Sequence, residues 1–126
     1  MFFAVNCMDR ESMFLVTEVK RYLKDNVYNE VCLREVCEHV NMSKSFVCDT
    51  FRKGTGYGII EYYRALKVGE AKRLIREKEW NMTRIAKELQ YMSVHQFSRS
   101  FKRQTGISPI AYRKMLEESK KMERNT

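Results

Sequence analysis

Residues 42–56, MSKSFVCDTFRKGTG, and residues 92–106, MSVHQFSRSFKRQTG, are two versions of one segment placed 50 positions apart. Met, Ser, Phe, Thr and Gly recur at the same offset, and a pair of basic residues follows each shared Phe. Self-similarity at a fixed offset indicates a duplicated supersecondary unit, because each copy folds by the same local rules.

The apolar pattern ahead of each copy also repeats, as Leu33-x-x-Val36-Cys37-x-x-Val40 and then as Met82-x-x-Ile85-Ala86-x-x-Leu89. The second pattern is shifted by one residue relative to the first. Each copy therefore predicts a helix, a short turn and a second helix, with the turn one residue longer in the second copy.

The ends of the second helix of each copy carry the expected signals. Ser43 and Ser93 stand at the N-cap position, where a hydroxyl accepts from amides of the first turn. Gly56 and Gly106 follow the last apolar residue, where a left-handed residue ends a helix at little cost.

Helical spacing assigns each of these two helices a buried and an exposed face. In the second copy Val94, Phe97, Phe101 and Gln104 are predicted to face inward. The opposite side then carries His95, Gln96, Arg99, Lys102 and Arg103.

In the first copy Val47 and Phe51 are predicted to face inward, and Lys44 to tilt toward the buried side. The outward positions are Ser45, Asp49, Arg52 and Lys53.

Residues 59–78 separate the two copies and contain no proline and a single glycine, Gly69. Their broad apolar band predicts one helix buried along much of its length. About 20 residues at ~1.5 Å each give roughly 30 Å, which is close to the ~34 Å of one B-DNA turn. Such a helix could hold two reading units one groove repeat apart.

The flanks predict two more helices. One begins at a Ser12 cap and runs to about Asp25, and another begins at Ser108-Pro109 and frays beyond Met115. The expected organisation is a linker or stub, a first helix-turn-helix subdomain, a linker helix, a second subdomain and a charged tail, at 1–11, 12–57, 58–79, 80–115 and 116–126.

The composition favours one basic, all-α domain. The chain has 126 residues, a formal charge of +8, and only 5 Gly and 1 Pro. A basic balance favours a polyanionic partner, either nucleic acid or an anionic membrane surface. No apolar run approaches the ~18 residues that span a bilayer, and residues 1–6 do not match a secretory leader, so a cytoplasmic protein is expected.

Four cysteines, Cys7, Cys32, Cys37 and Cys48, form no CxxC pair. His39 lies near Cys37, but one such pair is a weak metal signal. Reduced thiols that act as small hydrophobes are therefore expected, with no metal and no cofactor.

Residues 97–113, FSRSFKRQTGISPIAYR, fill every named position of the pattern Phe-Ser-Arg-x-Phe-Lys-x-x-x-Gly-x-Ser-Pro-x-x-Tyr-Arg. The chain thus resembles the AraC/XylS transcription regulators of bacteria, over about residues 12–115. The resemblance implies seven helices in two tandem helix-turn-helix subdomains joined by a long central helix. It also implies a monomer that contacts two successive major grooves of double-stranded DNA, a role as activator or repressor, and RNA polymerase as a partner. Further matching positions are Ser43, Phe51, Gly56, Tyr62, Ala71, Ile85 and Ala86.

Three positions depart from the family pattern. Gln90-Tyr91 replaces Gly-Phe in the second turn, so this turn either differs or is strained. Lys67 replaces Arg in the linker helix, which weakens any bidentate contact there. Asp49 places an acid where the first recognition helix is expected to approach DNA.

These assignments give a candidate DNA-binding site. Arg99 is the best candidate for the O6/N7 edge of guanine. Asp49 could accept from a cytosine amino group, although pairing within its own helix with Arg52 or Lys53 is favoured. The candidate base contacts are His95, Gln96, Arg99, Ser45, Cys48 and Asp49, and the candidate phosphate contacts are Lys44, Arg52, Lys53, Ser98, Lys102 and Arg103.

Two other function classes compete with DNA binding. An enzyme is disfavoured because the chain has only 2 His, no Gly-rich phosphate loop and no plausible catalytic constellation. A helical protein-interaction adaptor with a basic face remains the alternative to DNA binding.

Overall fold

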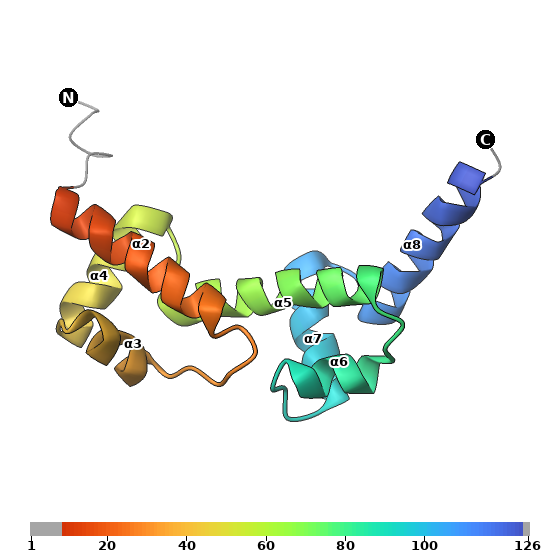
Figure 1. The fold of residues 1–126 in the computed structure, drawn as a ribbon, viewed down its shortest axis with the longest axis horizontal. Coiled ribbons are helices and arrows are strands. Elements are labelled where there is room, and N and C mark those ends of the chain that lie inside the picture. The colour runs from red at the N-terminus through yellow and green to blue at the C-terminus, as the bar shows by residue number, and fades with distance from the viewer. Residues whose placement is uncertain (1–8, 125–126) are drawn as a thin grey trace. The chain divides into compact units, whose positions relative to one another are not determined.

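The structure is a computed structural model that describes residues 9–124, and these residues form seven α-helices and no strand. The helices are α2 (Arg10–Asp25), α3 (Leu33–Val40), α4 (Lys44–Thr55), α5 (Ile59–Glu77), α6 (Met82–Glu88), α7 (Val94–Thr105) and α8 (Pro109–Arg124). The predicted all-α fold, with two helix-turn-helix units and a long central helix, is confirmed (Figure 1). The chain divides into two compact units between Leu66 and Lys67, a boundary that falls within α5.

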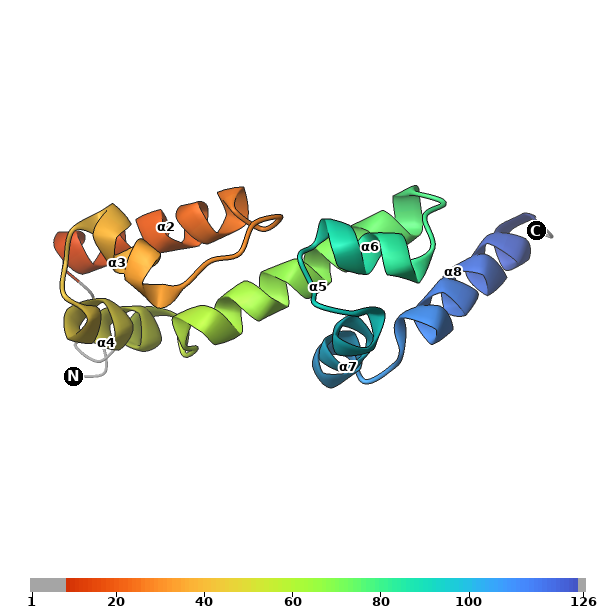
Figure 2. The same cartoon turned by 90° about the horizontal axis from the view of Figure 1, so that it is seen from below.

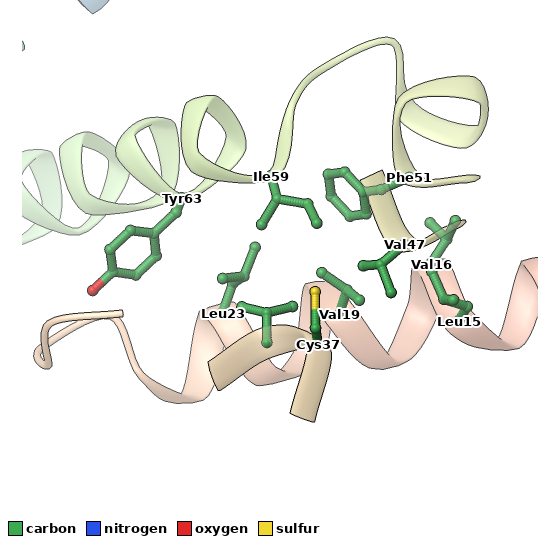
Figure 3. Packing of buried hydrophobic residues seen from close by; sticks show 10 residues of the cluster. Leu15, Val16, Val19, Leu23, Cys37, Val47, Phe51, Ile59 and Tyr63 are labelled. Atoms are coloured by element: carbon green, nitrogen blue, oxygen red, sulfur yellow. The ribbon is translucent and has the colours of Figure 1, made fainter. Parts of the chain in front are cut away.

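The first unit contains α2, α3, α4 and the beginning of α5. Both views show α2 beside α3 and α4 (Figures 1 and 2), and α2 makes its most extensive packing with α4. Ile59 and Tyr63, from the first turns of α5, point into the same core (Figure 3). This core buries Leu15, Val16, Val19, Leu23, Val36, Cys37, Val47, Phe51, Ile59 and Tyr63.

The second unit contains the rest of α5 with α6, α7 and α8. Phe97 and Phe101 are fully buried, with their ring centroids 5.9 Å apart, and Tyr112 of α8 lies 5.6 Å from Phe101. Large apolar side chains at this depth provide most of the stabilising burial. The other buried members are Val68, Ala71, Leu74, Ile75, Ile85, Ala86 and Leu89.

The start of α2 corrects the predicted Ser12 cap. Asp9 is the N-cap, and its carboxylate accepts from the Ser12 amide at 2.7 Å. This hydrogen bond lowers the pKa of Asp9 below its usual value. Both residues are good capping types, but Ser12 lies inside the helix that the earlier Asp begins.

The end of α8 is a second correction. The helix does not fray beyond Met115 but runs to Arg124, and its residues from Glu117 onward are exposed. No proline or glycine follows Pro109, and the mixed Glu, Lys and Arg residues are good helix formers.

The cysteines among the described residues, Cys32, Cys37 and Cys48, are free thiols, and Cys7 lies outside the described part. Burial raises the pKa of Cys37. The thiol form is therefore favoured, as expected for a small core hydrophobe.

Candidate nucleic-acid interface

The two candidate recognition helices, α4 and α7, begin and end in the same way. The Ser43 hydroxyl accepts from the amide of Phe46 at 3.3 Å, and the Ser93 hydroxyl accepts from Gln96 at 3.1 Å. The helices end at Gly56 and Gly106, with φ of 83° and 88°. The four predicted caps are confirmed. The second connection is longer, as predicted, but by two residues rather than one, since residues 41–43 join α3 to α4 and residues 89–93 join α6 to α7.

A threonine fixes the exit from each recognition helix. The Thr55 hydroxyl lies 2.8 Å from the carbonyl of Phe51 and accepts from the Tyr57 amide at 3.1 Å. Thr105 repeats this arrangement with Phe101 and Ile107, at 2.8 and 3.3 Å. The Thr that recurs in both copies of the sequence could have indicated these shared hydrogen bonds, but the sequence alone assigned it no role.

The outer face of α7 is basic and carries no acid. Its predicted inner residues Phe97 and Phe101 are buried and Val94 is half-buried, but Gln104 is exposed, which corrects its inward assignment. Gln104 belongs to the last turn of α7, beyond the last buried residue. None of the basic side chains on α7 forms an ion pair within residues 9–124. Exposed candidates on α7 are His95, Gln96, Arg99, Lys102 and Arg103, and Ser98 is half-buried.

Gln96 also supports the local backbone. Its side-chain oxygen accepts from the Met92 amide at 2.7 Å, while its own amide donates to Ser93. A bidentate contact to adenine would need both the oxygen and the nitrogen of the Gln side chain. In this conformation the Oε1 of Gln96 is used by the Met92 amide, so only its Nε2 donor is available to a base edge.

The outer face of α4 is less basic than that of α7. Asp49 is exposed and forms no ion pair within residues 9–124, so the favoured pairing with Arg52 or Lys53 is wrong for this structure. Lys44 is exposed rather than tilted inward, because it is the first helical residue and precedes the core contact of Val47. Ser45, Arg52 and Lys53 are exposed, and Cys48 is half-buried.

Arg52 turns toward the end of its helix. Its Nη2 lies 3.0 Å from the place that a Cβ would occupy at Gly58. The same turn is held by Glu61, whose carboxylate accepts from the Gly58 amide at 3.0 Å. The Arg52 guanidinium therefore lies beside the start of α5.

The turn before α7 explains two of the departures from the family pattern. Gln90 adopts the left-handed conformation with φ of 64°, so the turn keeps a glycine-like backbone without a glycine. Tyr91 packs on Phe97, with ring centroids 5.3 Å apart. The ammonium of Lys67 lies 5.3 Å from the centroid of the Tyr91 ring.

Lys67 is buried, with 7% of its surface exposed, and its ammonium donates to the carbonyl of Leu89. This carbonyl belongs to the C-cap of α6, where a cation is favoured. The single ammonium thus fastens the end of α6 to α5 inside the second unit, a role that sequence analysis did not assign.

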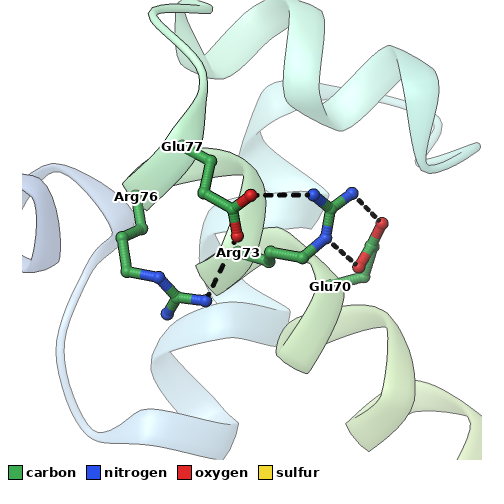
Figure 4. A network of polar contacts seen from close by, with 4 residues as sticks. All are labelled: Glu70, Arg73, Arg76 and Glu77. Atoms are coloured by element: carbon green, nitrogen blue, oxygen red, sulfur yellow. Dashed lines mark hydrogen bonds and ion pairs between the residues drawn. The ribbon is translucent and has the colours of Figure 1, made fainter.

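Most of the charged side chains at the end of α5 pair with each other (Figure 4). Arg73 contacts Glu70 at 2.7 Å and Glu77 at 3.4 Å, and Arg76 contacts Glu77 at 3.5 Å. Such exposed pairs add little stability. They do neutralise positive charge on α5, whereas the cations of α7 stay uncompensated.

A second cationic cluster surrounds Trp80 in the turn before α6. The Arg84 guanidinium lies 3.9 Å from the centroid of the Trp80 ring, and Lys78 lies 5.9 Å from it. Arg113 of α8 donates to the Trp80 carbonyl at 2.6 Å. The Tyr-Arg end of the family pattern thus fixes α8 against this turn, which the sequence did not reveal.

Within residues 9–124, no three His, Cys, Asp or Glu side chains are grouped so that they could hold a metal ion. No helix in this part of the chain is long and apolar enough to cross a membrane.

A family profile described as a helix-turn-helix domain matches residues 36–115. A transcriptional regulator from Chromobacterium violaceum, described as an AraC-type DNA-binding domain-containing protein, has the same fold, with a TM-score of 0.79 at 18% identity over 86% of this chain and 96% of that chain. The chain belongs to the AraC/XylS family of transcription regulators. This family is one of DNA-binding regulators and not a class of enzymes.

Among its relatives, the regulator YfiF of Bacillus subtilis is 31% identical over 109 residues, which cover 86% of this chain and 34% of YfiF. The activator AarP of Providencia stuartii is 28% identical over 99 residues, which cover 79% of this chain and 73% of AarP. The DNA-binding domain of AdpA, solved in complex with a target DNA, has a TM-score of 0.77 at 22% identity and covers 82% of this chain and 94% of that chain. This chain spans 34% and 42% of the lengths of the B. subtilis relatives YfiF and YobQ.

Proposed function

We propose that this chain binds double-stranded DNA sequence-specifically for a transcription regulator, with α4 and α7 in successive major grooves. The observation that carries the proposal is the outer face of α7. Its exposed Arg99, Lys102 and Arg103 have no acidic partner within residues 9–124, on a helix that contains no acid. Elsewhere in the same unit Arg73 and Arg76 are neutralised by carboxylates.

The side chains divide into two roles. Arg99 lies nearest the centre of the exposed face, and its planar fork suits the O6/N7 edge of guanine. His95 and the Nε2 donor of Gln96 lie near the helix start, which is the part of a recognition helix that meets base edges. The phosphate contacts on this helix are Ser98, Lys102 and Arg103, which position the helix without reading sequence.

In the first unit Ser45, Cys48 and Asp49 are the base-edge candidates, and Lys44, Arg52 and Lys53 contact phosphates. Asp49 is available to accept from a cytosine amino group, since it has no ion-pair partner within residues 9–124. The absence of a neutralising cation also makes it repel phosphates. The first unit thus contributes less to affinity than the second.

The partner and assembly form part of the same proposal. The chain acts as a monomer because it carries two helix-turn-helix units, and it operates in the cytoplasm, where bacterial DNA is found. RNA polymerase is the protein partner, a role supported by relatives named as activators, such as AarP. The chain performs no catalysis.

The proposal is tested by selecting bound sites from a random duplex pool and then competing the selected duplex against its scrambled version. We expect the selected duplex to bind at least ~1,000-fold more tightly, as specific sites do. Arg99→Ala should lower this ratio. Arg21→Ala is its matched control for charge loss and should leave the ratio unchanged, since Arg21 pairs with Glu18 on α2 at 2.6 Å. Equal binding of both duplexes would instead favour an adaptor whose basic face meets an acidic protein.

A further inference from the structure

An aromatic side chain lies exposed in the first turn of α4. Phe46 is 42% exposed and is the third residue of the helix. Its neighbour Val47 is fully buried, and so is Phe51 one turn later. Phe46 belongs neither to the core of the first unit nor to the partly buried residues packed against it. Packing inside this unit therefore leaves a large part of Phe46 open to solvent.

The surroundings of Phe46 are those of the proposed DNA face. Asp49 and Lys53 follow it at i+3 and i+7, which places them on the same side of the helix. Ser45 precedes it, and all three neighbours are exposed. The Phe46 amide is held by the Ser43 cap. The ring therefore lies on the capped first turn of the proposed recognition helix, among polar groups.

The repeat places a polar residue at the equivalent position of the second unit. Gln96 stands 50 positions after Phe46, and it offers an Nε2 donor from an exposed site. At this position of the repeat, the first unit thus presents an apolar ring and the second unit presents a hydrogen-bond donor. A ring cannot satisfy the polar edges of guanine, cytosine or adenine, so covering them would cost free energy. Thymine alone presents a methyl group in the major groove.

We propose that Phe46 reads the 5-methyl group of a thymine in the major groove contacted by α4. The inference rests on the proposed function and names one base that the first unit selects. Its contribution comes from removing the methyl group and the ring from water, and burial of one methyl group is worth about fourfold in affinity.

Deoxyuridine provides the direct test, because it keeps every hydrogen-bonding group of thymine and lacks only the methyl group. In the selected duplex, each thymine of the half-site under α4 is replaced in turn by deoxyuridine. We expect one replacement to weaken binding of the unaltered chain about fourfold. Phe46→Ala should bind the thymine duplex more weakly than the unaltered chain does. Its affinity should not change when that thymine is replaced by deoxyuridine.

Phe46→Gln, which copies the residue of the second unit, is the matched variant and should also lose the thymine dependence. Thermal unfolding followed by circular dichroism checks that both variants fold. The inference is overturned if no replacement affects the unaltered chain, if the half-site lacks thymine, or if Phe46→Ala keeps the penalty. Failure of the proposed function looks different, because then no duplex is selected at all.

Discussion

In both candidate recognition helices, α4 and α7, a serine hydroxyl caps the first turn, a threonine hydroxyl closes the last turn and a left-handed glycine ends the helix. The residues between these points differ. The outer face of α7 carries Arg99, Lys102 and Arg103 without an acid, whereas the face of α4 mixes Asp49 with Arg52, Lys53 and the exposed ring of Phe46.

This contrast separates two kinds of constraint. The caps satisfy backbone amides and carbonyls that every helix end leaves open, so both copies need the same few residues. The side chains of the outer face are exposed, so folding does not require the same residues there in both copies. The similar parts of the repeat therefore report the fold, and the different parts are where we expect the two units to differ in what they bind.

The two turns differ in a similar way. Asn41 occupies the left-handed position of the first turn with φ of 56°, and Gln90 occupies it in the second with φ of 64°. Asn tolerates this conformation better than a longer side chain does. The longer second turn also leaves Met92 89% exposed, whereas its counterpart Met42 packs against the first core.

The largest effect is expected at Lys67, whose ammonium fastens the end of α6 to α5 in the second unit. In the first unit the neutral hydroxyl of Tyr63 makes the corresponding contact, to the carbonyls of Asn26 and Asn29. Lys67→Met keeps the length of the side chain but removes the donor to the Leu89 carbonyl. We expect a loss of about 1.5–3 kcal/mol, as for hydrogen bonds to charged groups. Urea unfolding measures it. Lys20→Met is the control, since the exposed Lys20 only approaches the Tyr62 ring at 5.8 Å, and an equal loss there would contradict the assignment.

Substitutions at Arg99 and Lys102 distinguish base reading from phosphate contact within α7. Arg99→Ala should cost about 1–3 kcal/mol on the selected site and relax the preference at one or two base positions. Lys102→Ala should weaken all sequences alike and lower the slope of log affinity against log salt by about one unit. Binding titrations at several salt concentrations distinguish the two, and a uniform loss in both variants would remove Arg99 from base reading.

Comparison of the two turns predicts a smaller effect, an increase in the free energy of unfolding. Gln90→Gly should raise stability by up to about 1 kcal/mol, because glycine adopts positive φ without the steric cost of a side chain. Asn41→Gly should change stability by only a few tenths of a kcal/mol, since Asn already tolerates this conformation. Thermal unfolding of both variants gives the comparison, and a destabilised Gln90→Gly would show that the turn is not strained.

The smallest expected effect is at Asp49. Asp49→Ala should leave affinity unchanged or raise it a few-fold, mainly on scrambled DNA, because a repulsive charge near phosphates is removed. The affinities are compared on the selected and the scrambled duplex. A large loss confined to the selected duplex would instead make Asp49 a base-reading residue and the first unit an equal partner.

Much of this fold could be predicted because the two copies of the repeat carry the same helix-capping residues and the same apolar spacing. Ser43, Ser93, Gly56 and Gly106 are capping residues whose chemistry is readable without tertiary context. The Ser12 cap was wrong because Asp9 is an equally good cap three residues earlier, and periodicity does not choose between them. Gln104 was wrong because spacing gives a direction along a helix but not where the neighbouring core ends.

The candidate site was predictable in its residues and less so in their partners. Exposure of Arg99, Lys102 and Arg103 followed from helical period, but the use of the Gln96 oxygen by Met92 depends on the conformation of the preceding turn. The contact of Lys67 with the Leu89 carbonyl could not be predicted, for a different reason. Its carbonyl partner lies 22 residues away and becomes its neighbour only when α6 packs on α5.

The central claim, that one chain reads DNA with two unequal units, is tested most directly by hydroxyl-radical footprinting on the selected duplex at known protein-to-DNA stoichiometry. The account predicts one chain per duplex and two protected patches on one face, about 10 base pairs apart. The patch weakened by Arg99→Ala should be the stronger one. A single patch, or protection that requires two chains, would contradict the account.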